Sequence, residues 1–171
     1  IIVTADHGDM LGERGLWYKM NFFEHSGRVP LIMAGPGVAG GAVSSPCSLV
    51  DILPTMVDIA ASTGAAKPAL GQPIDGRSLL PMASTGDEDH GDAIGEYCAE
   101  MTADPVIMIR RGRFKYIHCD SDAPLLYDLE ADPDEMVNLA GSAGHADIAA
   151  AFAAESADGW PMAVSYTHLT L

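Results

Sequence analysis

Two adjacent residues, Asp6 and His7, have side chains that could bind a divalent cation. They follow Ile1–Thr4, a run that predicts a short buried strand, and they precede a glycine. Carboxylates and neutral imidazoles both bind divalent cations, and ligands gather at the carboxyl ends of strands in an open α/β sheet. Two residues do not fill a coordination sphere, so further ligands would have to come from elsewhere. The alternative interpretation is a turn with a capping Asp and a surface His.

Two other charged residues are candidates for binding an ionic substrate. Lys19 is flanked by aromatic residues, so a partly desolvated ammonium could present a positive charge to an anionic oxygen. The alternative is a surface lysine whose stem covers an apolar patch. Glu96, beside Tyr97, could face a bound cation, and the alternative is a solvated glutamate on a strand.

Composition and charge argue against several classes of protein. The 171 residues are 48% hydrophobic, which is enough for a packed core, and no apolar run approaches the ~18 to 20 residues of a membrane helix. The 9 Lys and Arg residues against 24 Asp and Glu residues give a formal charge of −15, which argues against a nucleic-acid partner. The motifs of serine hydrolases, HExxH zinc proteases and P-loop enzymes are absent from the sequence. We therefore expect neither a membrane nor a nucleic-acid partner.

The three cysteines, Cys47, Cys98 and Cys119, are widely separated and form no CxxC motif. This spacing indicates neither a zinc site nor a disulfide framework. We expect reduced thiols and, from them, a cytoplasmic protein.

The pattern along the chain predicts an α/β part, residues 1–92, followed by a small antiparallel subdomain, residues 93–163. In the first part, Met10–Met20 reads as a loop and Leu49–Ala61 as an amphipathic helix with Asp51 as its N-cap. In the second, Ala146–Ala157 predicts a surface helix. Four strands are expected before it, at Ala93–Glu100, Pro105–Arg110, Arg113–Cys119 and Leu125–Leu129.

Both ends of the sequence are unusual. Because Ile1 already lies in a predicted core strand, we expect further residues of the domain to precede it. Residues 164–171 resemble the translation of a sequencing adapter, and we expect this tail to lie outside the natural fold.

Three stretches of the chain carry a family resemblance. The first is Thr4–Lys19 with Phe23–Glu24 and Arg28–Ile32, the second is Gly95–Glu100 with Met108–Gly112 and Phe114–His118, and the third is Leu126–Glu135 with Asn138–Ala140. Together they resemble the sulfatases of the alkaline phosphatase superfamily, and the first two resemble the choline-sulfatase branch. The resemblance implies the C-terminal part of an alkaline-phosphatase-like sulfatase α/β fold plus a small antiparallel β-rich C-terminal subdomain.

The resemblance also implies roles for four residues. Asp6 and His7 would bind the catalytic divalent cation, with calcium first and magnesium or manganese also open. Lys19 would contact the sulfate group and the bridging oxygen. Glu96 would face the quaternary ammonium of choline, which cannot donate a strong hydrogen bond.

The implied activity is hydrolysis of choline O-sulfate to choline and sulfate by a homo-oligomeric full-length enzyme. The family's nucleophile is a formylglycine made from Cys or Ser in a C/S-x-P-S/A-R motif, which this sequence lacks, and Cys47 does not fit it. We therefore expect the nucleophile to lie outside these residues and the chain to be inactive alone. The alternatives are a phosphonate monoester or phosphodiester hydrolase of the same superfamily, and a non-catalytic truncated product.

Overall fold

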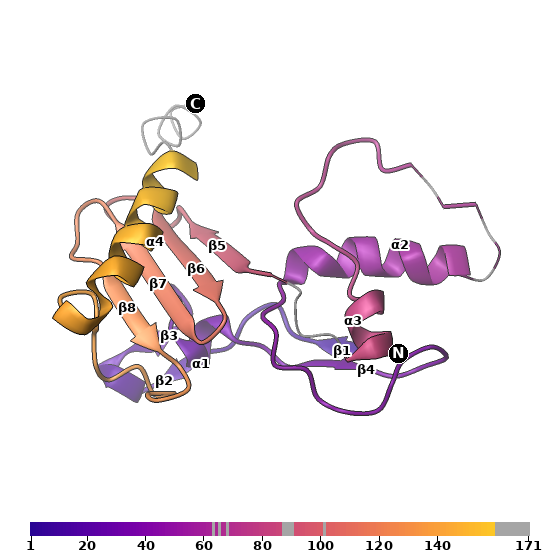
Figure 1. The fold of residues 1–171 in the computed structure, drawn as a ribbon, viewed down its shortest axis with the longest axis horizontal. Helices are drawn as coiled ribbons and strands as arrows, with labels where there is room; N and C mark the ends of the chain where they lie inside the picture. Colours follow the sequence, from indigo (N-terminus) through magenta and orange to yellow (C-terminus); the bar gives the residue numbers. More distant parts are fainter. Residues whose placement is uncertain (63, 65, 68, 87–90, 101, 160–171) are drawn as a thin grey trace. The chain divides into compact units, whose positions relative to one another are not determined.

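The computed structural model describes residues 1–62, 64, 66–67, 69–86, 91–100 and 102–159 (Figure 1). The tail at residues 164–171 lies outside the described residues. The chain forms two compact units: the first unit holds residues 1–6 and 29–93, and the second unit holds residues 7–28 and 94–171. The division expected between residues 92 and 93 stays a prediction. Within the described part of the chain, no helix combines the length and the apolar character needed to cross a membrane.

The first unit contains a two-stranded sheet and two helices. Strand β1 (Ile2–Thr4) pairs antiparallel with β4 (Leu31–Met33), and a 3-10 helix at Leu49–Asp51 leads into α2 (Ile52–Ser62). The second helix is α3 (Leu80–Thr85). The predicted strand at the N-terminal end and the predicted helix after residue 48 are both confirmed, but the strand is not buried as expected, since Val3 is 49% exposed.

The N-cap prediction was wrong by three residues. The N-cap of the 3-10 helix that leads into α2 is Ser48, whose backbone N–H donates to Asp51 Oδ2 at 2.9 Å in a capping box. Asp51 is buried, and its Oδ1 also accepts the backbone N–H of Arg77 at 2.8 Å. The carboxylate of Asp51 therefore joins the start of α2 to the turn before α3. This contact spans 26 residues, whereas a helix cap bonds only to its own helix.

The second unit is built on a four-stranded sheet in the order β5-β6-β7-β8. Strands β6 and β7 pair antiparallel, as do β7 and β8. All four strands predicted from the sequence are confirmed, as β5 (Ala93–Tyr97), β6 (Val106–Arg111), β7 (Phe114–Cys119) and β8 (Leu125–Asp128). The predicted C-terminal helix is α4 (Ala146–Gly159), preceded by a 3-10 helix at Ala143–His145.

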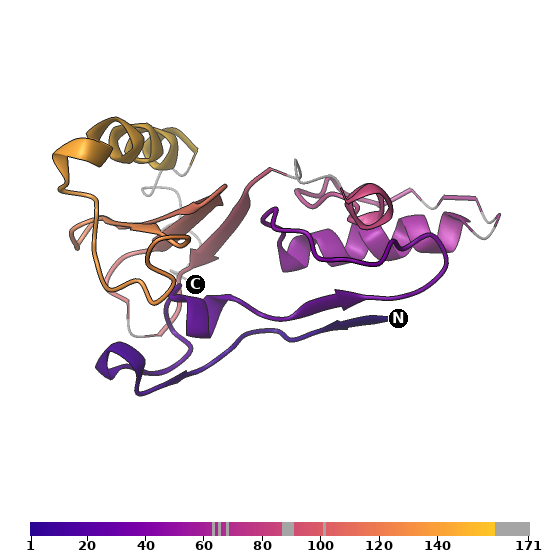
Figure 2. The same cartoon turned by 60° about the horizontal axis from the view of Figure 1, so that its bottom comes forward.

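Helix α4 covers one face of this sheet (Figures 1 and 2). Its Phe152 stacks on Tyr116 of β7, with ring centroids 5.6 Å apart. The same core cluster contains Ile107, Ile109 and Leu126, all nearly fully buried. Side chains alternate between the faces of a strand, so the neighbours of these residues, Lys115 among them, point to the opposite face.

The opposite face of the sheet is covered by residues 7–28 (Figure 2). This segment holds a hairpin of β2 (Met10–Leu11) and β3 (Trp17–Tyr18), a 3-10 helix at Glu13–Gly15 and a single helical turn, α1 (Glu24–Gly27). The loop predicted for Met10–Met20 is therefore partly wrong. Two-residue strands are too short to give a period-two pattern, and the turn between them needs left-handed backbone at the non-glycine residue Arg14, with φ at 56°.

Candidate functional site

The structure brings together two of the four predicted site residues, His7 and Lys19. Lys19 Nζ lies 2.7 Å from His7 Nε2. An ammonium group has no lone pair, so Lys19 donates and Nε2 accepts. The ring proton then sits on Nδ1, which donates to the carbonyl oxygen of Gly8 at 2.8 Å. The two contacts fix the orientation of the His7 ring, with Nε2 facing Lys19 and Nδ1 facing the backbone carbonyl of Gly8.

An open hollow of about 370 Å³ surrounds this pair, and it is lined by His7, Asp9, Tyr18, Lys19 and Met20. It offers one ammonium, one carboxylate, one imidazole and one phenol to a small polar ligand. Asp9 and Tyr18 were not predicted as site residues. The sequence holds a signal for Asp9, two residues after His7, but none for the left-handed turn that places Tyr18.

Helix α1 fixes the backbone on both sides of the pair. Ser26 is 2% exposed, and its hydroxyl lies 2.7 Å from the carbonyl oxygen of Lys19 and 3.0 Å from that of Asn21. The carbonyl of Ser26 in turn accepts the backbone N–H of Gly8 at 2.8 Å. One buried residue therefore holds the main chain beside both His7 and Lys19.

Gly8 is required at its position by close packing. A Cβ atom on this residue would overlap the carbonyl oxygen of His25 and stand 3.1 Å from the carbonyl carbon. The glycine in Asp6–Gly8 thus lets the main chain approach α1 closely enough for the hydrogen bond to Ser26. Asp-His-Gly is more than a flexible turn here, because its third residue sets the position of the second.

Three charged residues, which we call the Lys115 cluster, lie between α1 and the sheet: the buried Lys115 and Glu135 and the partly buried Glu24. Lys115 is 3% exposed and Glu135 1%. Lys115 Nζ pairs with Glu24 and lies 3.0 Å from Glu135 Oε1. It also donates to the carbonyl of Phe22 at 2.9 Å, and Glu135 Oε2 accepts the backbone N–H of Glu24 at 2.7 Å.

Arg14 extends this polar contact to the hairpin. Its guanidinium donates to the carbonyl oxygen of Glu135 and lies 4.3 Å from the centroid of the Phe23 ring. It also reaches the hydroxyl of Tyr127 at 3.4 Å, and burial raises the pKa of that phenol. Tyr127 is therefore protonated at neutral pH. Sequence reasoning missed all of these residues as contributors to the site, although a lysine among the apolar residues of β7 is a visible signal.

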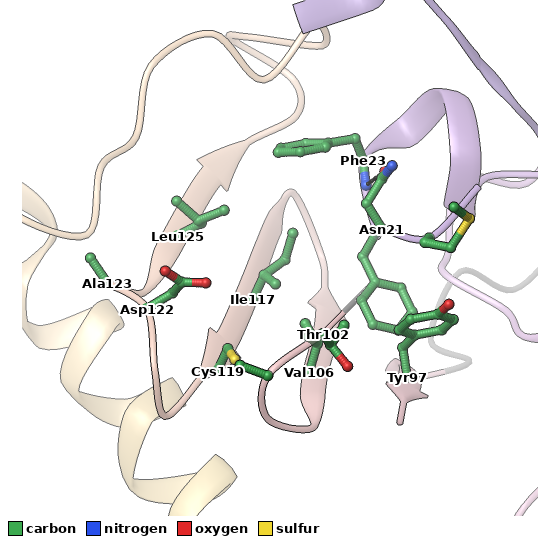
Figure 3. A pocket seen from close by; sticks show the side chains of 13 residues that line it. Asn21, Phe23, Tyr97, Thr102, Val106, Ile117, Cys119, Asp122, Ala123 and Leu125 are labelled. Carbon is green, nitrogen blue, oxygen red and sulfur yellow. Dashed lines mark hydrogen bonds between the residues drawn. The ribbon is translucent and has the colours of Figure 1, made fainter. Parts of the chain in front are cut away.

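A second pocket, of about 250 Å³, lies beside Met20–Phe23 (Figure 3). Its other walls come from the ends of the sheet strands and their loops, including Tyr97, Ile117, Cys119 and Leu125. Asp122 carries the only formal charge among its lining residues. The pocket touches the hollow around Lys19 through Met20, which lines both.

The other two predicted residues are placed as follows. Asp6 is exposed and precedes His7 in the chain, but it belongs to the first unit. Glu96 is exposed on β5 and is not among the lining residues of either pocket. The roles of both stay predictions.

The carboxylate of Asp6 is an ordinary ligand of a divalent cation, and so is an imidazole nitrogen with a free lone pair. His7 Nε2 would become such a ligand only when Lys19 Nζ, which lies 2.7 Å from it, moves to another acceptor. In the part of the chain that the structure describes, no three His, Cys, Asp or Glu residues are grouped to hold a metal ion. Asp6 and His7 can therefore supply only part of a coordination sphere. Burial raises the pKa of Cys47, so its thiol stays protonated at neutral pH, which agrees with its exclusion as a nucleophile.

Comparison with known proteins identifies the family. A family model described as N-sulphoglucosamine sulphohydrolase, C-terminal, matches residues 12–158. The choline-sulfatase of Rhizobium meliloti (strain 1021) is 49% identical over 140 residues, which is 82% of this chain and 27% of that protein. Two solved structures each align with 92% of this chain. They are a 2-O GAG sulfatase (31% identity, TM-score 0.74, 35% of that protein) and the phosphonate monoester hydrolase of Agrobacterium radiobacter (32% identity, TM-score 0.72, 34% of that protein).

The chain spans 27% of the curated choline-sulfatase that it matches. Its mixed helices and antiparallel sheets agree with the predicted C-terminal sulfatase fold, and the solved structures confirm that prediction. The match of the family model over residues 12–158 confirms the resemblance drawn from the three sequence stretches. This chain belongs to the sulfatase family and corresponds to its C-terminal part.

Proposed function

We propose that this chain is part of a sulfuric ester hydrolase that cleaves choline O-sulfate to choline and sulfate. The observation that carries the proposal is the contact of Lys19 Nζ with His7 Nε2 at 2.7 Å, inside an open hollow. An exposed ammonium next to an imidazole is suited to receive a small oxyanion. The 49% identity to a choline-sulfatase supports the choice of substrate.

The chain's own residues would act on the charge that develops as the S–O bond breaks. Lys19 would stabilise the departing oxygen, since a preorganised cation lowers the barrier most where negative charge appears. Its backbone is held by Ser26, so the ammonium is presented from a fixed main chain. Asp6 and His7 would hold a divalent cation, which when bound offsets the negative charge of the sulfate group.

Glu96 would recognise the organic half of the substrate. A quaternary ammonium has no N–H to donate, so carboxylates and aromatic faces are the groups that can bind it. Glu96 is exposed, and the formal charge of −15 favours a ligand that carries a positive charge. We expect Glu96→Gln in the full-length protein to raise the KM for choline O-sulfate, with little effect on an uncharged sulfate ester. Equal KM changes for both esters would contradict this role.

The activity is tested in the full-length protein with Lys19→Ala. Removing one preorganised charge at an oxyanion costs about 10²–10³-fold in kcat, and we expect a loss of that size with a small change in KM. The matched control is Lys67→Ala, which removes an exposed lysine paired with Asp58 in the first unit. Sulfate release from choline O-sulfate is the readout. Equal turnover by the parent and Lys19→Ala would refute the role of Lys19.

A second candidate is a phosphonate monoester hydrolase. The solved hydrolase from Agrobacterium radiobacter, 32% identical with a TM-score of 0.72, favours it. Parallel assays with choline O-sulfate and a phenyl phosphonate ester separate the two functions. A higher kcat/KM on the phosphonate ester would replace our first candidate with this one. Cytoplasmic location and homo-oligomerisation stay predictions.

A further inference from the structure

We propose that the Lys115 cluster is a positioning device that sets the geometry of Lys19 and His7 through helix α1. The inference rests on the proposed function for its catalytic consequence, but its structural part stands on its own contacts. Lys115, Glu24 and Glu135 would be positioning residues, because none of them lines the hollow around Lys19.

The first link joins the sheet to α1. Lys115 on β7 pairs with Glu24, the first residue of α1, and donates to the carbonyl of Phe22 at 2.9 Å. Glu135 receives the backbone N–H of Glu24 at 2.7 Å. These contacts hold both the side chain and the main chain at the start of α1. Lys115 and Glu135 are buried and Glu24 is partly buried, so solvent screens the Lys115–Glu135 pair least.

The second link joins α1 to the candidate site. Ser26, two residues after Glu24, contacts the carbonyl of Lys19 through its hydroxyl and the N–H of Gly8 through its own carbonyl. A shift of α1 therefore moves the main chain next to both members of the Lys19–His7 pair. Lys19 and His7 would keep their relative position only if α1 moved as a rigid unit.

Apolar packing gives the segment only part of its support. Met10 is buried and Phe23 meets the ring of Tyr127 at 6.1 Å, but Trp17 and Tyr18 are 62% and 67% exposed. Beside Met20–Phe23 the pocket of Figure 3 separates the segment from the strand ends. Polar contacts at α1 must therefore hold this segment in place where apolar packing does not.

The cluster joins the three distant stretches of the sequence that carry the family resemblance. Glu24 lies in the first stretch, Lys115 in the second and Glu135 in the third. Each supplies a charge that would be costly to bury alone, because an unpaired buried ion loses its hydration. Their partnership links the loop that bears the site to two later parts of the chain.

The test uses Lys115→Met in the full-length protein, with Arg111→Met as the matched control. Arg111 lies on the same sheet and pairs with Glu155 of α4, at 2.9 Å. A misplacement of about 1 Å can cost about 10²-fold in rate, so we expect kcat to fall at least ten-fold in Lys115→Met. We expect KM to change less than three-fold, partial recovery of kcat in Lys115→Arg, and no loss of kcat in the control.

Combining Lys115→Met with Lys19→Ala shows whether the effect passes through Lys19. In a Lys19→Ala background only His7 is left to misplace, so adding Lys115→Met should lower kcat by a smaller factor than it does in the parent protein. The same loss factor in both backgrounds would overturn the proposal, because it would show that Lys115 does not act through Lys19.

Amide hydrogen exchange gives a readout that needs no activity. In Lys115→Met, residues 19–27 should exchange at least ten-fold faster, while β6 keeps the rate of the parent protein. If Lys115→Met does not fold, Glu24→Gln replaces it, because this change removes one charge and keeps the backbone bond to Glu135. Unchanged exchange over residues 19–27 would overturn the proposal. Absence of sulfate ester hydrolysis by the parent would refute the proposed function alone, since exchange would still decide the positioning role.

Discussion

Replacing Gly8 by alanine would test the link between close packing and the candidate site. The added methyl group would overlap the carbonyl oxygen of His25, which belongs to the backbone of α1 and cannot rotate away. The main chain must therefore move by about 1 Å before the two groups reach ordinary contact. That movement also strains the 2.8 Å hydrogen bond from Gly8 N–H to the carbonyl of Ser26.

Two costs add up in this variant. Overpacking a filled region destabilises by about 1–3 kcal/mol. Weakening one backbone hydrogen bond adds about 1 kcal/mol. We therefore expect Gly8→Ala to lose about 2–4 kcal/mol of folding free energy, and the displaced His7 backbone to lower kcat by about 10²-fold.

The assay is chemical denaturation of the full-length protein together with steady-state kinetics on choline O-sulfate. Gly141→Ala is the matched control, since a Cβ atom there meets nothing within 4 Å. The control should stay within about 0.5 kcal/mol of the parent protein, which is usual for surface substitutions. A Gly8→Ala protein that is as stable and as active as the control would show that α1 can move away from the added methyl group at no cost. Our account of the site would then be wrong.

Three further outcomes follow from the structure. Ser26→Ala leaves the carbonyl of Lys19 without the hydroxyl that contacts it, so we expect a loss of about 1–3 kcal/mol by urea denaturation and a lower kcat. Asp51→Asn places an amide against the N–H groups of Ser48 and Arg77, and we expect a loss of about 1.5–3 kcal/mol, seen as faster amide exchange in α2. Arg113 donates to Asp128 at 2.7 Å and holds the pKa of that carboxyl below its usual range. A lowered pKa stabilises the fold above the unfolded pKa, about 3.9, and the benefit is lost as pH falls through the folded pKa. Arg113→Met should therefore lower stability at pH 7, and urea melts should show the difference shrinking below about pH 4; a difference that grows on acidification would contradict the assignment.

The sheet of the second unit was predictable because its strands are long enough to show alternation. Tyr116 and Lys115 occupy neighbouring positions on β7, and the apolar one faces α4 while the charged one faces the opposite way. Four to six residues suffice for this pattern. Residues 10–18 gave no such signal, because strands of two residues have no period and the turn between them needs positive φ at Arg14.

The candidate site was predictable in part. The types of Asp6, His7 and Lys19 indicated ionic chemistry, but their mutual placement did not follow from spacing. Lys19 reaches His7, twelve positions before it in the chain, because a hairpin folds the intervening residues back on themselves. Local propensity does not determine that path, since the contacts that fix it come from residues as far along the chain as Glu135.

A lysine at an inward-facing position of a strand is itself informative about the rest of the chain. Burying Lys115 without a partner would cost several kcal/mol, so its side of β7 has to be met by carboxylates. The two that meet it, Glu24 and Glu135, lie 91 residues before it and 20 residues after it. Each of these three charged residues therefore depends on the other two to stay in place. The position of the loop with Lys19 depends on all three, because α1 connects that loop to them. A protein cut after residue 113 would leave Glu24 without its lysine. The geometry of the candidate site is consequently a property of the second unit as a whole, and not of the Asp-His-Gly turn alone.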